Sequence, residues 1–292
     1  MLGRVVRLSS LRRAVQVISA VVSNFYLKGF AQLGIYQGPA KYACVPFLNC
    51  YSCPGAWAAC PVGAMQALLA AYKHQFSFYI AGLLTVVGGA TGRLVCGWFC
   101  PFGLVQEILG RFSSRKLVIP RLLTRFKFII LALTLLLPVL LVGETGVSSP
   151  YFCKFICPAG TLEAGVPLGL GRPELRSVLG GLFSWKLAVM VFFLVASVFT
   201  FRPFCQTTCP LGAFYALFNR ISLWRIEVNS DRCVSCGRCR AVCPLAIDVP
   251  DRPNGGDCIR CLECRDACPT GALAFTRAPV FPDAVVGGRE TN

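Results

Sequence analysis

Two runs of cysteine near the C-terminus have a spacing that could hold iron–sulfur clusters. The runs are Cys233-x2-Cys236-x2-Cys239-x3-Cys243-Pro244 and Cys258-x2-Cys261-x2-Cys264-x3-Cys268-Pro269. In this bacterial pattern three closely spaced thiolates hold one [4Fe–4S] cluster, and the fourth ligates the other cluster. We therefore predict one cluster on Cys233, Cys236, Cys239 and Cys268, and a second on Cys243, Cys258, Cys261 and Cys264.

The alternatives for these runs are a pair of zinc sites or a disulfide framework. Zinc sites usually combine one Cys-x2-Cys pair with a distant pair, and they rarely use a third cysteine at equal spacing. The doubled pattern therefore favours clusters. The region from Trp224 to Phe275 resembles a bacterial two-cluster ferredoxin domain, and this resemblance implies an α+β fold for it.

Nine of the other ten cysteines also occur in motifs. Three pairs follow one Cys-x3-Cys-Pro pattern, and a fourth group has a Cys-x2-Cys pair before a Cys-Pro. The members are Cys96 and Cys100, Cys153 and Cys157, Cys205 and Cys209, and then Cys50, Cys53 and Cys60. Only Cys44 has no motif, and we interpret it as an isolated buried thiol.

The composition of the remaining chain is typical of a membrane protein. Of its 292 residues, 55% are hydrophobic and 14% are charged, whereas soluble domains carry roughly 25% charged residues. The chain has 29 basic and 13 acidic side chains, and the basic excess lies in residues 1–201, where it flanks apolar runs. A nucleic-acid binder would instead cluster basic side chains on a polar domain. This pattern argues against a nucleic-acid partner and indicates contact with membrane lipid.

The apolar runs predict an α-helical membrane protein with about four transmembrane helices, followed by the α+β ferredoxin domain. Four segments, at about 14–36, 76–95, 126–143 and 182–201, approach the roughly 20 residues that a spanning helix needs. The predicted domains are a transmembrane four-helix domain at 1–221, a two-cluster ferredoxin domain at 222–276 and a flexible tail at 277–292.

Basic residues set the predicted orientation of these segments. Several arginines precede the first segment, and the loop between the second and third segments is the most basic one. Because cytoplasmic loops carry an excess of Lys and Arg, both termini are expected in the cytoplasm. The predicted location is a bacterial or archaeal inner (cytoplasmic) membrane, which the chain crosses several times.

This topology sorts the cysteines of the apolar part by membrane side. A third cluster is expected at the cytoplasmic face, with zinc or free thiols as the alternative, on Cys96, Cys100, Cys205 and Cys209. A fourth cluster is expected at the opposite face, with disulfides as the alternative, on four of Cys50, Cys53, Cys60, Cys153 and Cys157.

A multi-span chain with Cys-x3-Cys-Pro motifs and a C-terminal two-cluster ferredoxin domain resembles the NapH-type membrane quinol dehydrogenases, or polyferredoxins. These are related to NosR-type and FixG/CcoG-type proteins. The most specific membrane features are Cys96-x3-Cys100-Pro101 and Cys205-x3-Cys209-Pro210. The resemblance implies an oxidoreductase subunit that transfers electrons between a quinone pool and a redox partner. The remaining motif cysteines depart from the simplest NapH pattern and suggest an extra cluster.

We therefore predict a membrane-bound relay between the quinone pool, or an extracytoplasmic partner, and the ferredoxin domain. Other redox subunits or ferredoxins are the expected partners, and quinone is a further candidate ligand. The alternatives are an assembly factor that delivers metal or reductant, and an iron–sulfur redox sensor. A lone His74 excludes a bis-histidine haem. Neither it nor Glu107, Glu144 or Glu163 stands in a motif that marks a proton acceptor for quinol.

Overall fold

A computed structural model describes residues 2–71, 76–113, 117–142, 147–172, 174 and 180–277. His74, Glu144 and nearly all of the predicted tail at 277–292 lie outside these residues. One apolar core joins the helices of the N-terminal part, and a second core lies mainly within the C-terminal unit.

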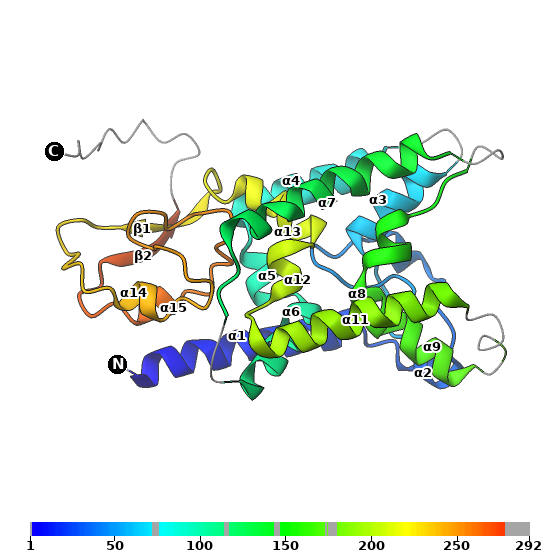
Figure 1. The fold of residues 1–292 in the computed structure, drawn as a ribbon, viewed down its shortest axis with the longest axis horizontal. Helices are drawn as coiled ribbons and strands as arrows, with labels where there is room; N and C mark the ends of the chain where they lie inside the picture. The colour runs from blue at the N-terminus through cyan, green and yellow to red at the C-terminus, as the bar shows by residue number, and fades with distance from the viewer. Residues whose placement is uncertain are drawn as a thin grey trace.

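The C-terminal unit is a small α+β fold at one end of the molecule (Figure 1). Strand β1 (Trp224–Val228) pairs antiparallel with β2 (Leu273–Arg277). Two short helices, α14 (Arg238–Ala241) and α15 (Glu263–Asp266), each contain the third cysteine of one run. The expected α+β character of this region is therefore present.

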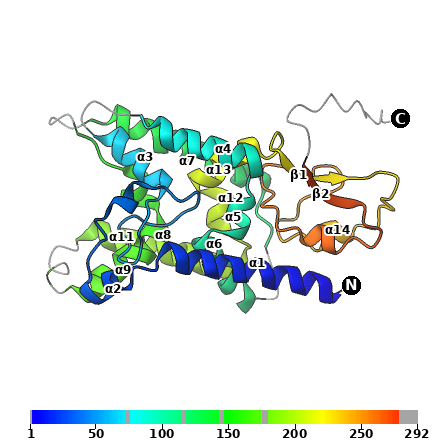
Figure 2. The same cartoon turned by 180° about the vertical axis from the view of Figure 1, so that it is seen from behind.

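Four longer helices run along the molecule in alternating directions (Figures 1 and 2). They are α1 (Leu2–Ser23), α4 (Phe78–Thr91), α7 (Arg121–Leu140) and α11 (Gly181–Phe199). Among the described residues, only α7 and α11 are long and apolar enough to cross a membrane, with mean hydropathies of 2.0 and 2.1. Only 28% and 17% of these two helices are buried, so their apolar side chains face outward and favour membrane association.

The first two predicted spans differ from the helices that form. The segment 14–36 is interrupted after Ser23. There the side-chain amide of Asn24 donates to the carbonyl of Ala20 and to Oδ1 of Asn49. A separate helix, α2 (Leu27–Gln32), follows. Segment 76–95 ends as a helix at Thr91, because Gly92 has a left-handed φ of 55° that turns the chain into α5 (Leu94–Trp98). Four transmembrane helices thus stay an expectation.

Short helices position the cysteines of the helical half. Four of them begin at the proline of a Cys-Pro pair, which is favourable because proline at the first helical position lacks only an N–H that would have no partner. These are α3 (Pro61–Ala70), α6 (Pro101–Leu109), α8 (Pro158–Gly160) and α13 (Pro210–Phe218). The other short elements are α9 (Val166–Gly171), α12 (Pro203–Thr207), the 3-10 turns η1 (Pro39–Tyr42) and η2 (Gly110–Phe112), and the π-helical turns η3 (Phe152–Ile156) and η4 (Thr161–Gly165).

Candidate iron–sulfur sites

Eight cysteines of the C-terminal unit line two separate cavities. The distal ferredoxin quartet consists of Cys233, Cys236, Cys239 and Cys268, and the proximal ferredoxin quartet consists of Cys243, Cys258, Cys261 and Cys264. Each cavity receives three cysteines of one run and the fourth of the other, which is the arrangement that the spacing predicts. Four thiols around one enclosed space fit a [4Fe–4S] cluster in each quartet.

The four Cys-Pro pairs of the helical half share one local geometry. Each cysteine is the N-cap residue of a short helix, and a glycine follows three residues later. At Cys157 and Cys209 the amide of this glycine donates to the thiol. The pairs are Cys60 with Gly63, Cys100 with Gly103, Cys157 with Gly160 and Cys209 with Gly212. The N···S distance is 3.3 Å in the last two pairs. The sequence pattern Cys-Pro-x-Gly therefore specifies a thiol at a helix N-terminus.

This geometry suits a metal ligand better than a free thiol. A helix N-terminus favours negative charge and so lowers the pKa of a thiol there. Burial has the larger and opposite effect, because it raises the pKa of Cys157 to about 12 although the Gly160 amide lowers it in part. Such a thiol keeps its proton until a metal displaces it. All eighteen cysteines of the chain are described, and all are free thiols rather than disulfides.

The middle quartet consists of Cys96, Cys100, Cys205 and Cys209, which are all buried and interact electrostatically with one another. Two buried arginines hold the backbone around it. Arg93 donates to the carbonyl of Cys205 over 2.9 Å, and Arg202 donates to the carbonyl of Cys96. Gln106 Nε2 lies 3.1 Å from Sγ of Cys205. These cationic and N–H groups would stabilise the negative charge of a thiolate-bound cluster.

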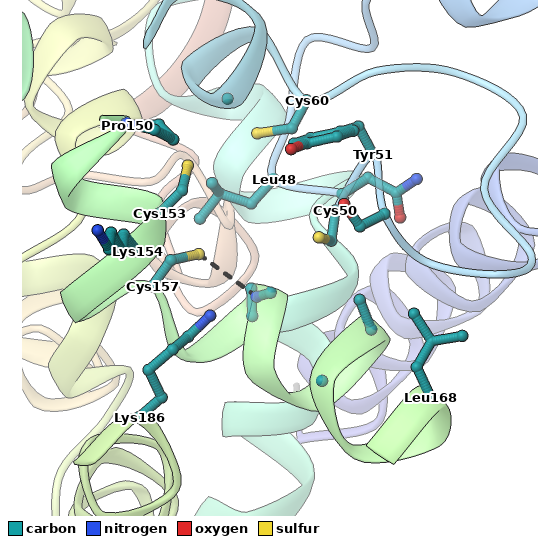
Figure 3. Close-up of a pocket in the computed structure, with 17 residues that line it drawn as sticks. Leu48, Cys50, Tyr51, Cys60, Pro150, Cys153, Lys154, Cys157, Leu168 and Lys186 are labelled. Carbon is teal, nitrogen blue, oxygen red and sulfur yellow. Dashed lines mark hydrogen bonds between the residues drawn. The ribbon is translucent and has the colours of Figure 1, made fainter. Parts of the chain in front are cut away.

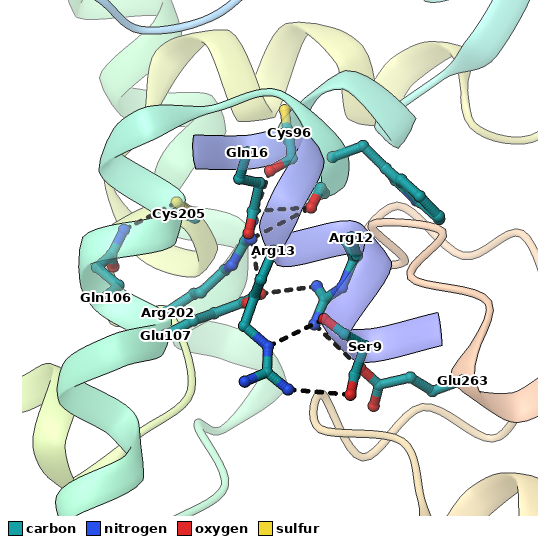
Figure 4. Close-up of polar contacts among 12 residues, drawn as sticks. Ser9, Arg12, Arg13, Gln16, Cys96, Gln106, Glu107, Arg202, Cys205 and Glu263 are labelled. Carbon is teal, nitrogen blue, oxygen red and sulfur yellow. Dashed lines mark hydrogen bonds and ion pairs between the residues drawn. The ribbon is translucent and has the colours of Figure 1, made fainter. Parts of the chain in front are cut away.

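A buried network of ion pairs lies beside the middle quartet (Figure 4). Oε1 of Glu107 lies 2.7 Å from a guanidinium nitrogen of Arg12 and 2.7 Å from a guanidinium nitrogen of Arg202. Arg12 also reaches Oε1 of Glu263, in α15, over 3.0 Å. The network therefore links α1, α6 and the segment before α12 to the C-terminal unit, and its charges are satisfied by each other rather than by water.

The far quartet lies at the end of the molecule opposite the C-terminal unit. It consists of Cys50, Cys60, Cys153 and Cys157, which line one cavity of about 320 Å³ (Figure 3). Gly160 faces this cavity, since a Cβ at this position would be in ordinary contact, at 3.5 Å, with Sγ of Cys50. Among the described residues no group of three metal-ligating side chains is arranged to hold a single ion. Four thiols spread around a cavity of this size instead fit a larger group such as a cluster.

The fifth candidate at this end, Cys53, does not line the cavity. Its side chain is buried, and burial raises the pKa of the thiol although the backbone amides of Gly55 and Ala56 lower it in part. Cys44 is also outside the cavity, and burial raises the pKa of its thiol to about 11. The sequence did not decide which four of these five cysteines form a site, and the geometry favours the four that line the cavity.

Aromatic side chains connect the far and middle quartets. Phe152, next to Cys153, and Phe204, next to Cys205, have ring centroids 6.5 Å apart. Tyr215 is fully buried, and its hydroxyl donates to the carbonyl of Pro46 over 2.8 Å. Three thiols of the middle quartet and Cys60 of the far quartet all interact electrostatically with this hydroxyl. Packed aromatic side chains therefore lie between the two quartets.

Backbone contacts connect the middle quartet to the proximal ferredoxin quartet. Gly97, between Cys96 and Trp98, packs so closely that a Cβ on it would lie 2.3 Å from the carbonyl oxygen of Ile259. The indole N–H of Trp98 donates to the carbonyl of Arg260 over 2.9 Å. Ile259 and Arg260 lie between two cysteines of the proximal ferredoxin quartet, Cys258 and Cys261. The contact thus joins two candidate sites through a few atoms.

Sequence reasoning missed the charged residues that hold these sites together. Arg12 is one of the arginines before the first predicted span, where basic residues indicate orientation in the membrane, yet its side chain is buried in the ion-pair network. Glu107, a weak candidate for a proton acceptor, is paired with two arginines. The Glu163 carboxylate is held by the backbone amide of Cys50 over 2.6 Å, and burial raises its pKa to about 7. A Glu or Arg without a motif gives no sign of a partner far away in the chain.

The described fold and its thiol sites are those of a ferredoxin-type iron–sulfur protein. A family described as 4Fe-4S binding domain matches residues 58–79, 73–120, 128–167 and 184–229, just over half of the chain. The chain belongs to this family. A second family of the same description matches residues 224–245, which include the first cysteine run of the C-terminal unit.

Curated relatives support the same class of electron-transport protein. The methylamine utilization ferredoxin-type protein MauN of Paracoccus denitrificans is 30% identical over 56% of this chain and 52% of its own length. The putative electron transport protein YccM of Escherichia coli is 24% identical over 60% and 48%, and the regulatory protein NosR of Stutzerimonas stutzeri is 28% identical over 53% and 20%. The chain thus spans about half the length of MauN and YccM. No solved structure matches it.

Proposed function

We propose that the chain is a membrane-bound relay in which four [4Fe–4S] clusters carry electrons between the far end and the C-terminal unit. The clusters would occupy the far, middle, proximal ferredoxin and distal ferredoxin quartets in this order. The chain would cross the inner membrane several times, with both termini in the cytoplasm and the far quartet on the opposite side. Either direction of flow uses the same route.

The observation that carries this proposal is the series of contacts that joins the far, middle and proximal ferredoxin quartets. The Phe152 and Phe204 rings bridge the far and middle quartets, and the Gly97 contact with Ile259 bridges the middle and proximal ones. A redox sensor needs only one cluster, and an assembly factor needs no connected series. The arrangement therefore favours a relay over both alternatives.

A quinone could exchange electrons with this relay at an apolar cavity of about 90 Å³ between α3 and α13. Its walls include Val62, close to Cys60 of the far quartet, and Leu211, close to Cys209 of the middle quartet. Thr134 of α7 is among the few polar groups there. A NapH-like reaction, in which quinol supplies the electrons, would place the quinone ring near both clusters.

The test is iron and acid-labile sulfide analysis, with EPR, of the full chain purified without oxygen. Four clusters correspond to about 16 iron atoms per chain. We expect Cys96→Ser to remove the signal of the middle cluster only and Cys157→Ser to remove that of the far cluster only. Cys53→Ser is the matched control, because this buried cysteine lies outside the far cavity and should leave the iron content unchanged.

A content of about eight iron atoms, with the two C-terminal signals alone, would contradict the relay. So would the loss of one and the same signal in both the Cys96→Ser and Cys157→Ser variants, because the two quartets would then not be separate sites. A loss of iron in Cys53→Ser would contradict the proposed ligand set of the far quartet and include Cys53 in it.

A further inference from the structure

A second large cavity, of about 410 Å³, lies between the start of α7 and the C-terminal unit. It is separate from all four quartets. Exposed arginines from three parts of the chain line it: Arg121 and Arg125 on the first turns of α7, Arg220 after α13, and Arg252 in the C-terminal unit. We call these four side chains the arginine rim.

The arginine rim has no acidic partner within the part of the chain that the structure describes. Two aspartates also line the cavity, but each is already paired: Asp257 accepts from Lys127, and Asp248 lies 3.3 Å from Arg240. No guanidinium of the rim makes an ion pair or a side-chain hydrogen bond among the described residues. Four like charges around one space repel each other unless an anion joins them.

The walls of the cavity indicate what kind of anion would fit. Guanidinium groups bind phosphate oxygens through paired N–H donors, and the N-terminus of α7 adds further positive potential. One side of the cavity is apolar, with Phe128 of α7, Leu217 of α13 and Leu245. An inorganic ion would make no use of this apolar side, whereas the chains of a lipid would.

We propose that the cavity binds a phosphate-bearing anion between α7 and the C-terminal unit, and the apolar wall favours an anionic phospholipid headgroup as its source. The headgroup would contact the arginine rim, and its acyl chains would follow the exposed apolar surface of α7. Binding would fasten the cluster-bearing C-terminal unit to the membrane surface, where basic side chains attract anionic lipids.

The test is native mass spectrometry of the full cluster-loaded protein in detergent, with phosphatidylglycerol or phosphatidylcholine added. We expect retention of phosphatidylglycerol over phosphatidylcholine. Each of Arg125→Gln and Arg252→Gln should weaken the retention roughly tenfold, as expected for the loss of one charge-assisted contact. The matched control is Arg111→Gln, which removes the same charge from an exposed site outside the cavity and should keep the retention.

A parallel arm adds inorganic phosphate alone and follows thermal unfolding. Stabilisation by phosphate that disappears in Arg252→Gln, without retention of lipid, would assign the site to free phosphate. Retention that persists in both rim variants would overturn the proposal, because the lipid would then not contact the arginine rim. Retention that falls equally in Arg111→Gln would also overturn it, because the effect would then reflect net charge alone. EPR of Arg252→Gln shows whether the clusters, and so the fold, are intact.

Discussion

In the C-terminal unit each quartet takes three cysteines from a run of seven residues, whereas in the helical half the motif pairs that form a quartet are far apart in the chain. The distal ferredoxin quartet is also more accessible than the middle quartet. Cys236 of the distal quartet is exposed, while all four thiols of the middle quartet are buried. A site made from local sequence can lie at the surface, where it can meet a partner. A site made from helix N-termini exists only where the helices pack.

The two kinds of site also differ in what neutralises their charge. Around the middle quartet, Arg93 and Arg202 are buried with their donors on its backbone. At Cys268 of the distal ferredoxin quartet, burial raises the pKa of the thiol, but hydrogen bonds with the Thr270 side chain and with neighbouring backbone amides outweigh burial and lower the pKa. We therefore expect tertiary packing to set the reduction potential and the lability of a cluster in the helical half, and local loops to set them in the C-terminal unit.

The largest expected contrast is the response to an iron chelator. We expect the cluster of the distal ferredoxin quartet to be lost first, because Cys236 is exposed, while the middle cluster is retained. The expected loss is about four iron atoms per chain. Iron analysis and the disappearance of one EPR signal would measure it. Simultaneous loss of the middle cluster would mean that burial does not distinguish the two regions.

The ion-pair network that joins the two regions gives the next largest effect. Glu107→Ala removes the common partner of Arg12 and Arg202, so that buried Arg202 has no carboxylate partner and Arg12 keeps only Glu263. This should lower the free energy of unfolding by about 3–5 kcal/mol. Thermal or chemical unfolding measures it. Glu227→Ala is the control: this half-exposed carboxylate lies 3.6 Å from Arg225, and its loss should cost less than about 1 kcal/mol. Equal losses of stability in Glu107→Ala and Glu227→Ala would show that the network does not hold the helical half and the C-terminal unit together.

A smaller but more specific effect is expected where the two regions touch. In Gly97→Ala the new methyl group meets the Ile259 carbonyl, so the proximal quartet must move away from the middle one. Electron transfer between their clusters should slow severalfold, because the rate of electron tunnelling falls exponentially with the distance between the clusters. Freeze-quench EPR after rapid reduction measures this rate.

The control for Gly97→Ala is Gly89→Ala in α4, where a Cβ would meet no atom within 4 Å. Iron content should be unchanged in both variants. An unchanged rate in Gly97→Ala, with all clusters present, would show that electrons do not pass through this contact.

The sequence alone predicted how the cysteines of the C-terminal unit group together. The spacing of Cys233 to Cys243 and of Cys258 to Cys268 brings thiols together within one loop, so the grouping into two quartets needs no knowledge of the rest of the fold. The repeated Cys-Pro-x-Gly likewise determines a helix N-cap, because proline and the glycine amide act within one helical turn.

Only the tertiary structure decided how distant segments combine. It brought Cys50 and Cys60 to Cys153 and Cys157 and left Cys53 outside, and it buried Arg12 against Glu107 and Glu263. It also ended α4 at Gly92, inside a segment whose hydropathy alone predicted a longer span. Local patterns constrain residues within a few positions of each other, whereas burial and ion pairing between remote residues depend on how all the helices pack.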